Sequence, residues 1–147
     1  MTATTSGGVA MRGWRLWWMA CAVLLLAGCA STGKEMSALQ RAQYSWSAAI
    51  RWNDFEGAWN LVDPDWREAH PLDDLQLERY RQIQVSHYRD LASSPGESEA
   101  MREIEIGVIN RHTMAERTVR YTEQWRYDAE KETWWITGGL PDFWAGE

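Results

Sequence analysis

TVRYTEQWRY, the stretch Thr118–Tyr127, alternates larger, mostly apolar side chains with polar ones along its length. A period of two predicts a β-strand with one buried face. Segments 83–91 and 103–108 share the pattern, and 133–137 predicts a last short strand. Turn-forming residues connect these segments at 93–96, 113–115 and 128–132. We therefore expect a curved meander of four antiparallel strands.

The residues before the strands predict helices. Apolar side chains recur every three or four residues from Met36 to Trp52, which indicates an amphipathic helix. A second helix restarts at Asn53 and ends at Pro64. A third begins near Pro71 and runs to about Arg81, with Leu75 and Tyr80 as its buried contacts. Helices followed by antiparallel strands indicate an α+β domain with the helices on one face of the sheet.

Length and composition limit the classes of function. The chain has 147 residues, enough for one domain, and its 11 tryptophans argue against a disordered chain. Its net charge of −6 excludes most nucleic-acid binding, because a polyanion would be repelled. The three histidines, His70, His87 and His112, lie in different elements without a metal-ligand spacing, so we expect no metal site and no cofactor.

The N-terminal segment has the features of an export signal. Arg12 and Arg15 precede the apolar run LWWMACAVLLLAGC, residues 16–29. These 14 residues are fewer than the roughly 20 that a helix needs to span a bilayer, which favours a signal sequence over a membrane helix. An uncleaved helix and an ordinary secretory signal are the alternatives. Met11 stands directly before the basic residues and is an alternative start to Met1.

The end of this run resembles the lipobox of bacterial lipoproteins, in the residues Leu26-Ala27-Gly28-Cys29. The resemblance implies cleavage after residue 28, lipidation of Cys29 and acylation, including palmitate, of the new N-terminus. It further implies a signal peptide over 1–28; the small residues that follow predict a lipidated tether over 29–35, and the helix and strand patterns predict an α+β domain over 36–147. Ala30 in place of Asp implies the periplasmic face of the outer membrane.

The chain after the predicted cleavage site is strongly acidic. It keeps 13 basic and all 21 acidic residues, a net charge of −8. Cys29 would be blocked by lipid, and Cys21 lies in the predicted signal. The mature chain would therefore offer no thiol for a disulfide, a metal or catalysis.

From about Met36 to Trp144, the order of elements resembles the NTF2-like superfamily. The features that carry the resemblance are the helix break Asn53–Trp59, the segment Leu61–Pro64 and the hairpin from Trp125–Asp128 to Trp134–Ile136. The resemblance implies helices packed into the concave face of a bent sheet, which forms a cone with a pocket. This superfamily includes isomerases, cyclases, dehydratases and binding modules, so it does not select a function.

One acidic residue interrupts the apolar face of the third strand. Alternation places Glu123 beside Tyr121 and Trp125. A desolvated carboxylate in the cone would have a raised pKa and could act as an acid or base, with His87 or Tyr121 as a partner. The alternative is that Glu123 lies at the rim or pairs with an arginine.

The tryptophans suggest a binding surface. Trp134 and Trp135 point to opposite faces of the last strand, so some indole must be exposed. We take Trp134, Trp135 and Trp144 as candidate binding residues. The acidic charge favours a protein partner over lipid contact. The sequence thus predicts a lipid-anchored binding or assembly module, with an NTF2-like enzyme or a carrier of a small apolar ligand as alternatives.

Overall fold

In the computed structural model, residues 33–34 and 36–144 are described. All but the first two belong to one compact unit, Met36–Glu147. The predicted signal peptide and Cys29 lie outside the described residues. Within the described part, no helix combines the length and the apolarity needed to cross a bilayer.

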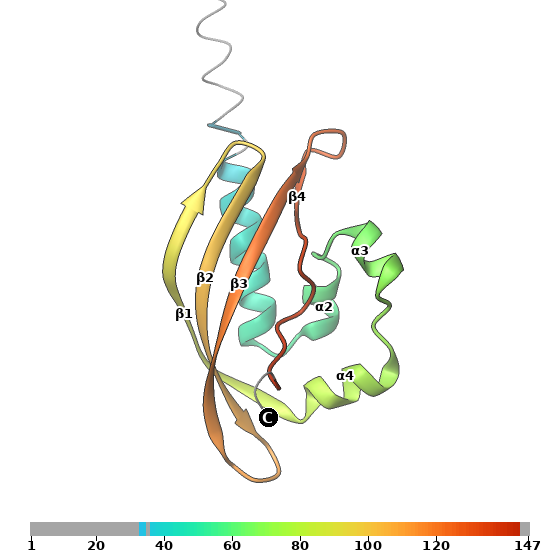
Figure 1. The fold of residues 1–147 in the computed structure, drawn as a ribbon, viewed down its shortest axis with the longest axis vertical. Helices are drawn as coiled ribbons and strands as arrows, with labels where there is room; N and C mark the ends of the chain where they lie inside the picture. The colour runs from blue at the N-terminus through green and yellow to red at the C-terminus, as the bar shows by residue number, and fades with distance from the viewer. Residues whose placement is uncertain (1–32, 35, 145–147) are drawn as a thin grey trace, which may run out of the picture. The chain divides into compact units, whose positions relative to one another are not determined.

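The domain has helices first and strands second (Figure 1). A long helix covers residues 36–51 and is followed by three short ones, α2 (Phe55–Trp59), α3 (Pro64–Ala69) and α4 (Asp74–Arg81). The strands are β1 (Ile83–Pro95), β2 (Glu99–Asn110), β3 (Glu116–Asp128) and β4 (Thr133–Ile136). They form one antiparallel sheet in the order β1-β2-β3-β4. This confirms the predicted α+β class and the four-stranded meander.

Aspartates cap the three short helices. Asp54 accepts a hydrogen bond from the backbone N–H of Gly57, and Asp73 forms a capping box with Gln76. Asp63 caps α3, whose first residue is Pro64. The sequence predicts Pro64 only as the end of a helix, so α3 is not among the predicted elements. Proline ends the preceding helix but is also well suited to the first position of a new one, because its fixed φ is helical and that N–H needs no partner.

An irregularity in β1 changes which of its side chains face the helices. The pairing with β2 shifts between Val85 and His87. Val85 and Tyr88 are both buried at 8% exposure, whereas His87 lies on the other face. The predicted strict alternation, which placed His87 inward, is therefore wrong beyond Val85. A β-bulge adds one residue to a strand and so reverses the facing of the residues after it.

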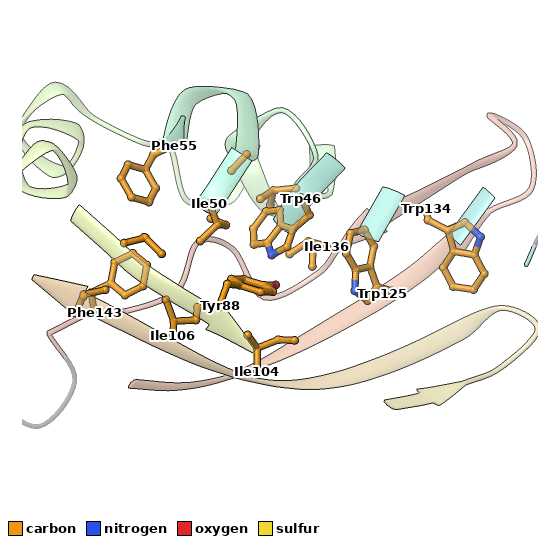
Figure 2. Close-up of a cluster of buried hydrophobic side chains, with 14 of the residues drawn as sticks. Trp46, Ile50, Phe55, Tyr88, Ile104, Ile106, Trp125, Trp134, Ile136 and Phe143 are labelled. Carbon is orange, nitrogen blue, oxygen red and sulfur yellow. The ribbon is translucent and has the colours of Figure 1, made fainter. Parts of the chain in front are cut away.

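The core fills the space between the sheet and the helices (Figure 2). Trp46, from the middle of the long helix, is fully buried, and its ring lies 6.3 Å from the rings of both Tyr121 and Trp125. On α4, Tyr80 packs against Phe55 at 4.9 Å, as expected. Leu75 is 81% exposed, so its predicted burial is wrong.

Candidate functional site

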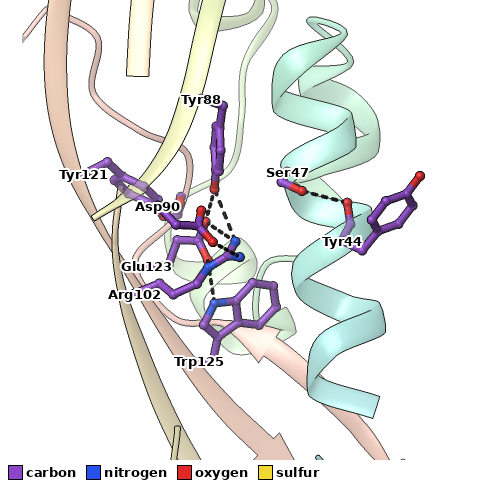
Figure 3. A network of polar contacts seen from close by, with 9 residues as sticks. Tyr44, Ser47, Tyr88, Asp90, Arg102, Tyr121, Glu123 and Trp125 are labelled. Atoms are coloured by element: carbon purple, nitrogen blue, oxygen red, sulfur yellow. Dashed lines mark hydrogen bonds and ion pairs between the residues drawn. The ribbon is translucent and has the colours of Figure 1, made fainter. Parts of the chain in front are cut away.

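Glu123 is fully buried at the centre of a polar cluster under the helices (Figure 3). Arg102 on β2 holds both carboxylate oxygens, with Nη2 at 2.8 Å from Oε1 and Nε at 2.9 Å from Oε2. The hydroxyl of Tyr88 donates to Oε1, and the indole N–H of Trp125 donates to Oε2 at 2.8 Å. The carboxylate thus receives four hydrogen bonds from three side chains.

Burial and these donors act on Glu123 in opposite directions. Burial raises the pKa of its carboxyl to about 8, whereas the hydrogen bond from Trp125 lowers it. The bidentate guanidinium of Arg102 also favours the ionised carboxylate, because an adjacent cation stabilises the anion. Burial lowers the pKa of Arg102, and Asp90 at 3.2 Å opposes that shift. The arrangement therefore suits a structural ion pair whose oxygens are already engaged.

His87 is not a partner of Glu123. Its ring packs over Gly107 on the face away from the helices, and its Nε2 lies 3.6 Å from Glu105. A Cβ at Gly107 would come within 2.2 Å of His87 Nδ1, so a larger residue there would have to displace the His87 ring. The bulge in β1 is the reason that Tyr88, rather than His87, reaches the buried carboxylate.

Tyr121 shares the apolar face of β3 with Glu123 but bonds elsewhere. Its hydroxyl donates to the carbonyl of Gly139 at 2.9 Å. Its ring stacks on Trp46, and burial raises the pKa of its phenol. The predicted same-face position is correct, but the hydroxyl of Tyr121 anchors the C-terminal segment instead of serving the carboxylate.

Arg102 is the residue that the sequence analysis missed. It stands directly opposite Glu123 in the β2–β3 register. The signal was present, because Ala100 and Arg102 continue the inward alternation of Ile104 and Ile106. The predicted strand began at residue 103, one position too late to include the arginine.

The three candidate tryptophans differ in exposure. Trp134 is 2% exposed and packs on Tyr127 at 5.3 Å, so it belongs to the core and cannot present its indole to a partner. Trp135 and Trp144 are half-buried. Trp144 lies with Trp66 along a surface cleft of about 510 Å³ between the α3–α4 region and the C-terminal segment, and Arg79 covers its ring at 4.1 Å. A role of Trp135 or Trp144 in binding stays a prediction.

A second buried carboxylate, Asp63, ties α3 to the sheet. Its side chain accepts from the backbone N–H of Asp65 at 2.9 Å and forms an ion pair with Arg126 on β3. Its own N–H bonds to the carbonyl of Ile136 on β4. Burial by itself would raise the pKa of Asp63, but the hydrogen bonds from Arg126 and Asp65 outweigh it and lower the pKa below its ordinary 3.8.

We expect Asp63 to contribute to acid unfolding. Because its pKa is lower in the folded state, its stabilisation is present above about pH 4 and is lost as the pH falls through the depressed value. Urea unfolding between about pH 2.5 and 5 should show a shallower pH dependence for Asp63→Asn than for the wild type. Equal slopes for the two proteins would contradict this role. Exposed Asp65→Asn, on the same helix, is the matched control.

The described residues contain no group of three or more His, Cys, Asp or Glu side chains placed to hold a metal ion. The buried cluster likewise consists of a carboxylate surrounded by hydrogen-bond donors. Its chemistry fits internal charge pairing better than ligation of a cation.

Comparisons with known proteins bear on the fold. No protein-family model matches the sequence, and no curated protein matches it. A SEC-C motif containing protein from Rhodopseudomonas palustris is similar in structure, with a TM-score of 0.53 and 20% identity over 65% of this chain and 72% of that one. A ketosteroid isomerase-like protein from Erwinia carotovora atroseptica gives a TM-score of 0.50 and 14% identity over 70% and 91%.

A more distant likeness, to a putative NTF2-like transpeptidase from Campylobacter jejuni, has a TM-score of 0.41 and 9% identity over 63% of this chain and 90% of that one. At these identities, likeness to solved structures bears on the fold alone. The domain has an α+β fold, with helices on one face of a curved four-stranded antiparallel sheet, and this fold is similar to that of the ketosteroid isomerase-like protein.

Proposed function

We propose that this protein is a bacterial lipoprotein, anchored through Cys29 at the periplasmic face of the outer membrane. Its NTF2-like domain would be a binding module for a protein of the cell envelope. The observation that carries the binding role is the state of Glu123, which has no exposed surface and whose oxygens are held by Arg102, Tyr88 and Trp125.

A catalytic carboxylate must reach a substrate, and this one does not. General acid or base catalysis needs the group within hydrogen-bond distance of the proton to be moved. Glu123 is enclosed by the core that Trp46 and Trp125 fill. The same filled core argues against an apolar ligand carried beneath the sheet. Binding through the outer surface is therefore better supported than catalysis or transport inside the cone.

The outer surface offers aromatic side chains on an acidic domain. Trp144 borders the cleft between the α3–α4 region and the C-terminal segment, and Trp135 lies beside a separate hollow of about 330 Å³ near the start of the long helix. With a mature net charge of −8, the domain as a whole favours a basic partner by charge complementarity.

The lipid anchor is tested by changing one residue. In a Gram-negative host, the wild-type protein should fractionate with outer membranes and carry acyl chains on Cys29 by mass spectrometry. Cys29→Ser should abolish both, because serine has no thiol to form the thioether to lipid, and the protein then lacks the two or three acyl chains needed to hold it stably. Cys21→Ser, within the predicted signal, is the matched control and should change neither. An unmodified Cys29, or unaltered fractionation of Cys29→Ser, would overturn the anchor.

The binding role is tested by co-purification from detergent-solubilised envelopes. The lipidated wild-type protein should recover a specific basic partner, and Trp144→Ala or Trp135→Ala should lose it, depending on which hollow is used. Met114→Ala, an exposed position in the β2–β3 connection, should retain it. Equal recovery by all three variants, or no specific partner for the wild type, would remove the support for this role.

A further inference from the structure

The long helix 36–51 carries arginines and aromatic rings on an exposed side. Tyr44 is 75% exposed and Trp52, just past the end of the helix, is 84% exposed. Figure 3 shows Tyr44 pointing away from the polar cluster, on the outer side of the helix. Arg41 and Arg51 are exposed as well, and the guanidinium of Arg51 also lies 5.4 Å from the ring of Tyr88. A spacing of 41, 44 and 51 places these three residues on one side of the helix, and Trp52 follows directly after its end; we call the four the arginine–aromatic face.

This face differs in charge from the rest of the molecule. Residues 36–52 contain Arg41 and Arg51 but no aspartate or glutamate, although the whole chain has 21 acidic residues. Acidic side chains resume at Asp54, which is occupied in capping α2. The helix therefore presents a locally positive surface on an acidic domain.

We propose that the arginine–aromatic face lies on the anionic lipid surface in which Cys29 is anchored. The proposal rests on the lipid anchor of the proposed function. Tyrosine and tryptophan favour the headgroup region because their rings are apolar and their tips are polar. Arginines add attraction to anionic headgroups. The aromatic rings of the face thus suit the boundary between headgroups and acyl chains, and its arginines suit the anionic headgroups.

The short tether supports the lipid surface, rather than a molecule far from the membrane, as the contact of this face. Only residues 30–35 separate Cys29 from the helix, and six residues reach about 20 Å at most. The start of the helix must therefore stay close to the bilayer. The acidic remainder of the domain would be repelled by the same lipids, so contact through this face is the favoured orientation.

The expectation that the acidic charge holds the domain away from lipid differs from what the charge of this one face predicts. That expectation used the net charge of the mature chain. Screening limits charge interactions to about 10 Å, so the charge of the nearest surface decides the contact. The nearest surface on a short tether is a helix without acidic residues.

The experiment uses the full lipidated protein in vesicles of phosphatidylcholine with and without phosphatidylglycerol. A fluorophore is attached at Ser45→Cys, an exposed position next to Tyr44 on the same side of the helix, or at Met114→Cys, exposed in the β2–β3 connection. Acylated Cys29 does not react, so each variant has one label. Headgroup spin-labelled lipid should quench the label at 45 on anionic vesicles and leave the label at 114 unquenched.

Variants of the face test its charge and its rings separately. Arg41→Gln with Arg51→Gln should shift the orientation equilibrium about 30-fold away from contact, whereas lysine at both positions should preserve it. Tyr44→Ala with Trp52→Ala should reduce quenching on both kinds of vesicle. All four side chains are exposed, so these variants should fold normally.

Failure of the two proposals gives different results. If the protein does not float with vesicles, the proposed lipid anchor is wrong. The proposed membrane contact of the arginine–aromatic face is then wrong as well, because it rests on the anchor. If the protein floats but the labels at 45 and 114 are quenched equally, the proposed lipid contact of the arginine–aromatic face is contradicted, whereas the lipid anchor is supported. If the label at 45 is shielded only after envelope proteins are added, the face binds a protein and the lipid proposal is likewise overturned.

Discussion

Replacing Arg102 by methionine is expected to lower the free energy of unfolding by about 3–5 kcal/mol, because it leaves the carboxylate of Glu123 buried without its cation. Tyr88 and Trp125 would still donate, but neither carries a charge. Urea unfolding followed by circular dichroism measures the change. The double variant Arg102→Met with Glu123→Met should recover most of the loss, since an apolar pair of similar size needs no compensation.

The pH dependence of the stability of Arg102→Met tests whether the uncompensated charge of Glu123 causes the loss. With Arg102 absent, burial raises the pKa of Glu123 without an opposing cation, so the folded state favours the protonated acid. Stability of the single variant should therefore be highest at or below about pH 4.5, the ordinary pKa of a glutamate, and should fall as the pH rises above it. The double variant should show no such slope. A single variant as stable as the wild type at about pH 7 would contradict the assigned role of the ion pair.

Replacing Trp46 by alanine is expected to lower the free energy of unfolding by about 3–5 kcal/mol, because its fully buried ring fills the space between Tyr121 and Trp125. The vacated space should bind indole, and saturating indole should restore part of the lost stability. Thermal unfolding with and without indole measures both effects.

Trp52→Ala supplies the matched control for Trp46. It removes the same side chain just past the end of the same helix, at a position 84% exposed, and should change stability by less than about 0.5 kcal/mol. Similar losses for the two variants would contradict a filled core. If indole stabilises the wild-type protein as strongly as it stabilises the Trp46→Ala variant, the core contains an open pocket. That result would support the alternative function as a carrier of an apolar ligand.

Much of the fold could be predicted because the strands carry local signals. The alternation of Val119, Tyr121 and Trp125 defines the inward face of β3 without reference to any partner strand. The same holds for Ile104 and Ile106 on β2. A period of two depends only on the backbone, so it can be read along the chain.

The candidate site could be predicted only in part. Glu123 stood out as a charge on an apolar face, and an arginine partner was among the alternatives considered. Which arginine, and that Tyr88 replaces His87, depended on a bulge in β1 and on the β2–β3 register. Neither feature has a recognisable signal in the local sequence, because each depends on how two strands align and not on the residues of one strand alone.

By itself the sequence determined the α+β class, the placing of helices before strands and the resemblance to a lipobox ending at Cys29, because each rests on neighbouring residues. Only the tertiary structure decided that Glu123 is enclosed by Arg102, Tyr88 and Trp125, that Trp134 is core, and that Trp52 is an exposed indole. Burial is a property of packing between segments far apart in the chain. The electrostatic state of a carboxylate follows from that packing, since the same side chain can be an acid in a pocket or an anion in an ion pair.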